Sequence, residues 1–431
     1  MKKVLKPKTS HEVLPSFGKA KVHRFVLPNG LRLFVQESKL APIFSYQTWY
    51  DVGSRDEEPG LSGIAHLFEH MMFKETKNMR QGVFDKTMES NGARDLNAFT
   101  STDYTAYVQS LPIEALDLVA KLESERMCHL LLTKKQFESE REVVHNERRQ
   151  RNENNPEGQM FEELQKLAFK VHPYGRPVIG FEEDLNRMTT ADCEKFYGEF
   201  YTPNNAVISV VGDVKPEKVL AIITKHYGKV APSKITRPEI QVEPEQREEK
   251  VLNMSLNVQV EKAYMAYKIP IADHPDQTPI SVLAAILSTG RSSRLYRALV
   301  DKGVTIDIGA GANPGKDAGL FYVTFSAQAG KKASDAIKAI DDEFATIMNK
   351  PISEEELRRA KNKLQTEFFM GLGTNSARAN FVAQNEIVLG DYKKAVRALE
   401  ELEEVTAEDV MRVTKSYFQK TNRSMVIGKP V

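Results

Sequence analysis

Two histidines and a glutamate in one short apolar stretch are suited to hold a metal ion and activate water. His66 and His70 stand four positions apart, so on a helix both imidazoles project from one face and can reach the same ion. Glu69 directly precedes His70, which places a carboxylate within reach of a bound water. The residue types and their spacing therefore predict a metal-dependent hydrolytic site with Glu69 as its general base.

The alternative for such a pair is two ordinary histidines on a helix. The neighbours of the polar triplet argue against it, because burial of three unpartnered polar groups would cost several kcal/mol. These neighbours are the apolar residues Ile64, Leu67, Phe68, Met71 and Phe73. The order His-x-x-Glu-His is also the signature of the inverted zincins. Zn²⁺ is therefore the expected cofactor.

A third metal ligand must come from elsewhere in the chain, because a catalytic zinc site takes three protein ligands and leaves one position open for water. The charged segment 134–152 is a predicted helix that ends at Asn154-Asn155-Pro156. Its glutamates Glu140 and Glu147 stand seven positions apart and share one helix face. Periodicity does not choose between them, and a solvated carboxylate among arginines is the alternative for either.

The elements that must position these residues are a mixture of strands and helices. Two alternating runs around Pro28-Asn29-Gly30 predict a hairpin, and 43–52 is a further predicted strand. Apolar residues recur at helical spacing in 60–74 and 113–132. The alternating segment 97–101 by itself fits an ordinary buried strand. The mixture predicts strands and helices in one fold.

A long repeat divides the chain. The segment 185–192 recurs at 402–409, and an aromatic pair and an asparagine follow each copy at the same offset of 217 residues. This period is too long for a solenoid, whose units have about 20–50 residues, and coincidence is the alternative to two copies of one domain. The repeat predicts an N-terminal domain at 1–230 with the histidine motif, a proline-containing linker at 231–250, and a homologous C-terminal domain at 251–431 without the motif.

Composition and charge narrow the class of function. The 431 residues include 60 Lys and Arg against 59 Asp and Glu, a net charge of +1, so nucleic acid is not an expected partner. No apolar run approaches the roughly 18 residues of a membrane span. As written, the chain shows no export signal and is expected in the cytoplasm; a removed signal peptide would instead place it in the periplasm. Cys128 and Cys193 are expected to be buried free thiols, with a disulfide as the alternative.

The chain resembles the pitrilysin/insulinase family of inverted zincins, and in size it is similar to the half-length, processing-peptidase-like subfamily. The matching stretches are Leu27 to Leu31, Gly63 to Met71, Asn97 to Ser101, Glu140 to Glu147 and Pro203 to Asn205. The resemblance implies an α+β fold of two homologous α/β domains, each a mainly antiparallel sheet with helices packed on one side, facing each other around a chamber. It also implies a zinc-dependent endopeptidase that cleaves unfolded peptides.

The resemblance assigns roles to individual residues. The matches to the family's zinc ligands are His66, His70 and Glu147. Glu69 matches the general base, and Glu140 matches a second carboxylate that supports the site.

A strand near the motif matches the family's substrate-binding strand. Asn97, Ala98 and Phe99 stand where family members hold the backbone of the substrate as an added strand. This implication opposes the reading of 97–101 as an ordinary buried strand.

The second copy departs from the family pattern. Members that act alone carry an Arg and, seven positions on, a Tyr that help to stabilise the oxyanion, but Leu299 and Ile306 stand there in this chain. We therefore expect a homodimer or heterodimer in which a homologous chain supplies the pair, unless Arg291 or Arg294 serves instead. The alternative function is a non-catalytic scaffold or assembly subunit of the same superfamily, which the intact histidine motif disfavours.

Overall fold

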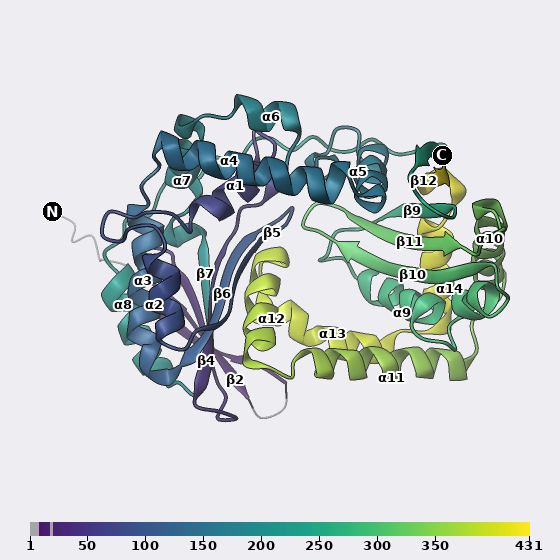
Figure 1. The fold of residues 1–431 in the computed structure, drawn as a ribbon. Coiled ribbons are helices and arrows are strands. Elements are labelled where there is room, and N and C mark those ends of the chain that lie inside the picture. Colours follow the sequence, from purple (N-terminus) through teal and green to yellow (C-terminus); the bar gives the residue numbers. More distant parts are fainter. Residues whose placement is uncertain (1–7, 18–19) are drawn as a thin grey trace. The chain divides into compact units, whose positions relative to one another are not determined.

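The computed structural model describes residues 8–17 and 20–431, which divide into two compact units (Figure 1). Unit 1 comprises Met1–Asn146, Pro177–Glu239 and Gly371–Val396, and unit 2 comprises Glu147–Arg176, Ile240–Met370 and Arg397–Val431. Each unit therefore takes segments from both halves of the chain. The domain limits near 230 and 251 remain a prediction.

Unit 1 contains a seven-stranded sheet. Its strands are β1 (Ser10–Pro15), β2 (Lys21–Val26), β3 (Arg32–Glu37), β4 (Ile43–Tyr50), β5 (Arg94–Thr100), β6 (Thr105–Pro112) and β7 (Ala206–Gly212). They lie in the order β1-β2-β3-β7-β4-β6-β5, with β3 and β7 parallel and the other neighbours antiparallel. The antiparallel pair β2 and β3 confirms the hairpin predicted around Pro28-Asn29-Gly30.

Both faces of this sheet are covered by helices. One face packs in the main core of unit 1 with α1 (Ile64–Met71), α3 (Leu116–His129), α7 (Thr190–Phe200) and α8 (Pro216–Tyr227). On the other face, Trp49 and Val207 pack against Val382 and Ala383 of α12 (Asn375–Val388). Side chains alternate between the faces of a strand, so fully buried strands such as β7 require cover on both sides.

Further helices complete unit 1. They are α2 (Val83–Ser90), α4 (Lys134–Arg148), which ends in unit 2, and α6 (Glu182–Arg187). The helix α13 (Tyr392–Glu404) begins in unit 1 and continues into unit 2.

Unit 2 contains a five-stranded sheet that repeats the topology of the first. Its strands are β8 (Lys250–Leu256), β9 (Lys262–Ile269), β10 (Thr305–Pro314), β11 (Gly319–Ala327) and β12 (Arg423–Pro430). Read from β8, the order β8-β12-β9-β11-β10 corresponds to β3-β7-β4-β6-β5, and the parallel pair stands at the same place in both sheets. The shared topology supports the homology that the long repeat predicted.

The sheet of unit 2 is also covered on both faces. The main core of this unit includes α9 (Gln277–Ser288), α10 (Ala333–Asn349), α14 (Ala407–Tyr417) and the start of α11 (Glu354–Gly371). On the other face, Met160 and Leu164 of α5 (Pro156–Ala168) pack with Leu256 and Val426. The two sheets with their helices confirm the predicted α+β class. None of the helices among the described residues is long and apolar enough to cross a membrane.

Candidate metal centre

The helix that carries the histidine motif is fixed at its first turn. Gly63 precedes α1 with φ +91°, and a Cβ built on it would lie 2.5 Å from the Ile179 carbonyl oxygen, so this position requires glycine. The buried carboxylate of Glu57 accepts hydrogen bonds from the backbone N–H groups of Gly63 and Ala65, both at 3.0 Å. A carboxylate at this end satisfies free N–H groups and complements the helix dipole.

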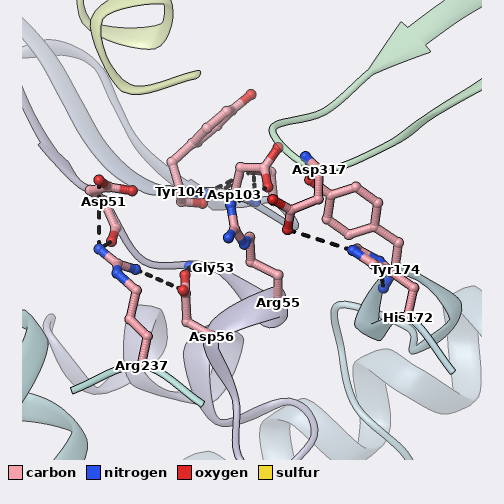
Figure 2. Close-up of polar contacts among 11 residues, drawn as sticks. Asp51, Gly53, Arg55, Asp56, Asp103, Tyr104, His172, Tyr174, Arg237 and Asp317 are labelled. Atoms are coloured by element: carbon pink, nitrogen blue, oxygen red, sulfur yellow. Dashed lines mark hydrogen bonds and ion pairs between the residues drawn. The ribbon is translucent and has the colours of Figure 1, made fainter. Parts of the chain in front are cut away.

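The loop before α1 is held by a residue of the predicted linker. Arg237 donates hydrogen bonds to Asp56 Oδ1 and to the Asp51 carbonyl, both at 2.7 Å (Figure 2). Burial raises the pKa of Asp56 despite the neighbouring guanidinium of Arg237. Arg55, beside Asp56, lies 3.8 Å from Asp103. These contacts anchor the segment that presents Glu57 to the helix.

The two histidines approach each other and Glu147 closely enough to share one ion. Their ring centroids are 4.9 Å apart, and one ligand atom from each of His66, His70 and Glu147 lies within 4.8 Å of the others. Ligands of tetrahedral zinc at about 2.0–2.1 Å would stand about 3.4 Å apart, so modest side-chain movement would close the site. Two imidazoles and one carboxylate are a donor set that suits zinc.

Glu147 occupies the end of α4, where the helix widens. The boundary between the two units falls between Asn146 and Glu147, inside one continuous helix. A π-helical turn, Arg149–Glu153, follows directly, and such turns are frequent at functional sites. One oxygen of Glu147 lies 2.7 Å from the guanidinium of the exposed Arg151.

Glu140 lies two helical turns before Glu147 and contacts a histidine instead. Its Oε2 is 3.6 Å from His70 Nδ1, and its Oε1 is 2.6 Å from Lys74 Nζ. Burial acts to raise the pKa of Glu140, but His70 and Lys74 together hold it below the usual value. The structure thus separates the two carboxylates that periodicity left equivalent.

Glu69 is buried beside the histidines and is held by a hydroxyl group. Thr100 Oγ1 donates a hydrogen bond to Glu69 Oε2 at 2.6 Å. Sequence reasoning did not assign a role to Thr100. Its signal was its place directly after Asn97, Ala98 and Phe99 on the same alternating strand.

The strand β5, with Asn97, Ala98 and Phe99, is the last strand at one edge of the sheet. On its inner side, Asn97 pairs with Val108 of β6, and the register shifts between Arg94 and Asn97. Bulges of this kind are common at sheet edges and beside active sites. The edge position differs from the ordinary buried strand that the alternation of 97–101 by itself suggested.

The second copy offers no replacement oxyanion donor at the expected positions. Leu299 is fully buried in the core of unit 2, and Ile306 is an exposed aliphatic side chain. Arg294 donates two hydrogen bonds to Glu356, at 2.7 and 2.8 Å. The guanidinium of Arg294 is therefore engaged within its own unit.

Comparisons with known proteins match both halves of the chain. Residues 33–182 match the family described as "Insulinase (Peptidase family M16)", and residues 187–364 match the "Peptidase M16 inactive domain". The chain is 32% identical to the zinc protease PqqE of Helicobacter pylori, covering 94% of this chain and 92% of that protein. It is 27% identical to an uncharacterized zinc protease of Mycobacterium leprae, and this match covers 95% of this chain and 92% of that protein.

A solved structure shares the whole fold. The crystal structure of a protease from Helicobacter pylori has a TM-score of 0.89 and 30% sequence identity, and the match covers 98% of this chain and 100% of that one. The crystal structure of a putative M16-like peptidase from Alicyclobacillus acidocaldarius has a TM-score of 0.85 and 21% sequence identity. That match covers 96% of this chain and 100% of the other. The likeness extends over both halves of the chain.

Proposed function

The chain belongs to the insulinase family of M16 peptidases, and on this premise we propose that it is a zinc-dependent endopeptidase that cleaves unfolded peptides. One observation carries the proposal: ligand atoms of His66, His70 and Glu147 converge within 4.8 Å, with the carboxylate of Glu69 on the same helix as both imidazoles. Hydrolytic zinc enzymes place a carboxylate beside a metal that has three protein ligands and a fourth position open to water.

The proposed metal ligands are His66, His70 and Glu147. Zinc, when bound, would act as a Lewis acid that lowers the pKa of a bound water and polarises a carbonyl group. Glu140 is proposed to orient the His70 ring through Nδ1, which lies 3.6 Å from its Oε2. Lys74 in turn holds the second oxygen of Glu140.

Glu69 is the proposed general base. Its carboxylate takes a proton from the attacking water and returns it to the amine that leaves. The Thr100 hydroxyl donates a hydrogen bond to Oε2 of Glu69, which limits rotation of the carboxylate. Such positioning lowers the reorganisation required in the transition state.

The edge strand β5 is the proposed site for the substrate backbone. An extended peptide can pair with an edge strand through main-chain hydrogen bonds, and a folded segment cannot present its backbone in this way. We propose that Asn97, Ala98 and Phe99 bind the peptide beside Glu69, because Thr100 at the end of the same strand contacts that residue.

A homologous partner chain is proposed to complete the oxyanion site. Leu299 and Ile306 cannot donate side-chain hydrogen bonds, and Arg294 is engaged by Glu356. The exposed Arg291 is the alternative donor within this chain. Loss of one preorganised oxyanion donor typically costs about 10²–10³ in kcat. The partner, either a second copy or a distinct homologue, would supply the Arg and Tyr.

The test is an assay with an internally quenched, unstructured peptide, with zinc content measured on the same samples. Glu69→Gln should keep zinc and lose about 10²–10⁴ in rate, because general-base catalysis contributes this much. Glu89→Gln, at an exposed position on α2, is the matched control and should leave both unchanged. A Glu69→Gln variant as active as the wild type would reject the assignment, and addition of homologous chains tests the partner.

A further inference from the structure

A buried ion pair lies immediately after the proposed metal ligand Glu147. Arg148, the last residue of α4, donates one hydrogen bond to each carboxylate oxygen of Glu162 on α5, both at 3.2 Å. Their side chains are 10% and 8% exposed. A two-point contact between a guanidinium and a carboxylate fixes orientation as well as distance, so the pair determines how the end of α4 meets α5.

The π-helical turn after Glu147 is held by the same helix. Asn152 donates a hydrogen bond to Glu162 Oε2 at 3.0 Å. Gly158 of α5 approaches the turn so closely that a Cβ on it would lie 1.9 Å from the Arg151 carbonyl oxygen. Arg151 contacts Glu147 itself. The helix α5 therefore fixes the backbone on the C-terminal side of the ligand at more than one point.

The internal repeat separates this arrangement from the needs of the fold. Helices α11 and α12 stand 217 positions after α4 and α5, with Leu364 in the place of Glu147. The counterparts of Arg148 and Glu162 are Gln365 and Ala379. The second copy thus forms both helices without the ion pair, and it also lacks the metal ligand. The Arg148–Glu162 ion pair therefore occurs in the copy that has the proposed metal ligand, and the two helices form in the other copy without it.

We propose that Glu162 is a positioning residue for Glu147, acting through Arg148 and Asn152; this inference rests on the proposed zinc site. Glu162 holds the last turn of α4 so that the Glu147 carboxylate stays directed at the metal. Arg148 Nε also lies 3.3 Å from Glu153, but loss of the two-point contact with Glu162 would leave most of a buried guanidinium without its carboxylate, and the turn would shift to expose it to water. Outer residues that orient metal ligands typically change metal affinity 10–100-fold.

The test is the zinc Kd of the full chain, measured by competition with a chromogenic chelator. Glu162→Gln should weaken zinc binding about 10–100-fold. Glu163→Gln is the matched control, because Glu162 and Glu163 both pair with Lys166 at 2.9 Å, whereas Glu162 also accepts hydrogen bonds from Arg148 and Asn152; it should bind zinc like the wild type. Circular dichroism of the zinc-free proteins establishes that each variant is folded.

A second variant decides the matter if Glu162→Gln does not fold. Arg148→Lys keeps the charge but loses the two-point contact, so it should also weaken zinc binding while its fold persists. Wild-type affinity in a folded Glu162→Gln, or in Arg148→Lys, would overturn the positioning role while leaving the zinc site intact. A wild-type chain that binds no zinc would overturn both this role and the proposed function.

Discussion

Corresponding helices carry polar candidate site residues in the first copy of the domain and aliphatic core residues in the second. In the first copy, α1 carries His66, Glu69 and His70; at the same offset, α9 of the second copy carries Leu283, Ile286 and Leu287. The proposed ligand and its supporting carboxylate on α4 correspond to Leu364 and Leu357 on α11. All of these aliphatic residues belong to, or pack against, the core of unit 2. A few side chains thus separate a candidate metal centre from a plain hydrophobic contact.

The comparison shows where each copy obtains its stability. Buried aliphatic side chains need no partners, and their removal from water is favourable by about 25 cal/mol per Å². Buried imidazoles and carboxylates need partners, because an unpaired polar group costs free energy in the interior. In the first copy, Thr100 contacts Glu69 and Lys74 contacts Glu140, and the proposed ion would be the partner of the imidazoles.

The largest expected effect is in the first copy. His70→Ala should lose most of its zinc and at least about 10²-fold in peptidase rate, since the tetrahedral site would lack one ligand. Metal analysis and the peptide assay measure the two effects on one sample. His129→Ala removes an exposed histidine on α3 that pairs with Glu125, and should change neither. Full zinc occupancy in His70→Ala would contradict the assignment.

The mirror substitution in the second copy should affect stability alone. Leu287→Ala should lower the free energy of unfolding by about 2–5 kcal/mol, because it leaves a cavity in a fully buried site. Denaturant titration measures this loss, and zinc content should stay at the wild-type level. Loss of zinc in a folded Leu287→Ala would show that the second copy contributes to the metal site.

A smaller effect is expected at Thr100. Thr100→Val keeps the shape of the side chain but removes the hydrogen bond to Glu69. Hydrogen bonds to charged groups contribute about 1.5–3 kcal/mol, which corresponds to about 10–100-fold in kcat, with little change in KM or zinc content. Thr100→Ser should restore the rate. A wild-type kcat in Thr100→Val would contradict the claim that the Thr100 hydroxyl positions the carboxylate of Glu69.

The smallest effect concerns the thiols, both of which are free; Cys193 is buried as predicted, whereas Cys128 is only half-buried. Cys193 is buried in the core of unit 1, as its counterpart Val410 is in unit 2. Burial raises the pKa of Cys193 to about 12 and that of Cys128 to about 11. Because the thiolate reacts, alkylation at pH 8 should be slow at both and slower at Cys193, rising about tenfold per pH unit. Rapid labelling of Cys193 in the folded chain would contradict this packing.

Local sequence patterns predicted the elements better than their long-range partners. The spacing of His66 and His70 indicated one helix face, and the 217-residue repeat indicated two related sheets; both depend on short-range periodicity or on internal similarity. The sequence did not indicate that α5 and α12 would each cover the second face of a sheet, because that pairing depends on tertiary packing. Nor could periodicity distinguish Glu140 from Glu147, since both occupy the same helix face.

The most direct test of the central claim is zinc K-edge X-ray absorption of the metal-loaded chain. The account predicts about one zinc per chain with two imidazole ligands and the remaining ligands oxygen, because His66, His70 and Glu147 are the residues that converge. In Glu147→Gln, zinc affinity should fall and the carboxylate contribution should disappear. A sulfur ligand, a single imidazole, or an unchanged spectrum in Glu147→Gln would contradict the assignment of this centre.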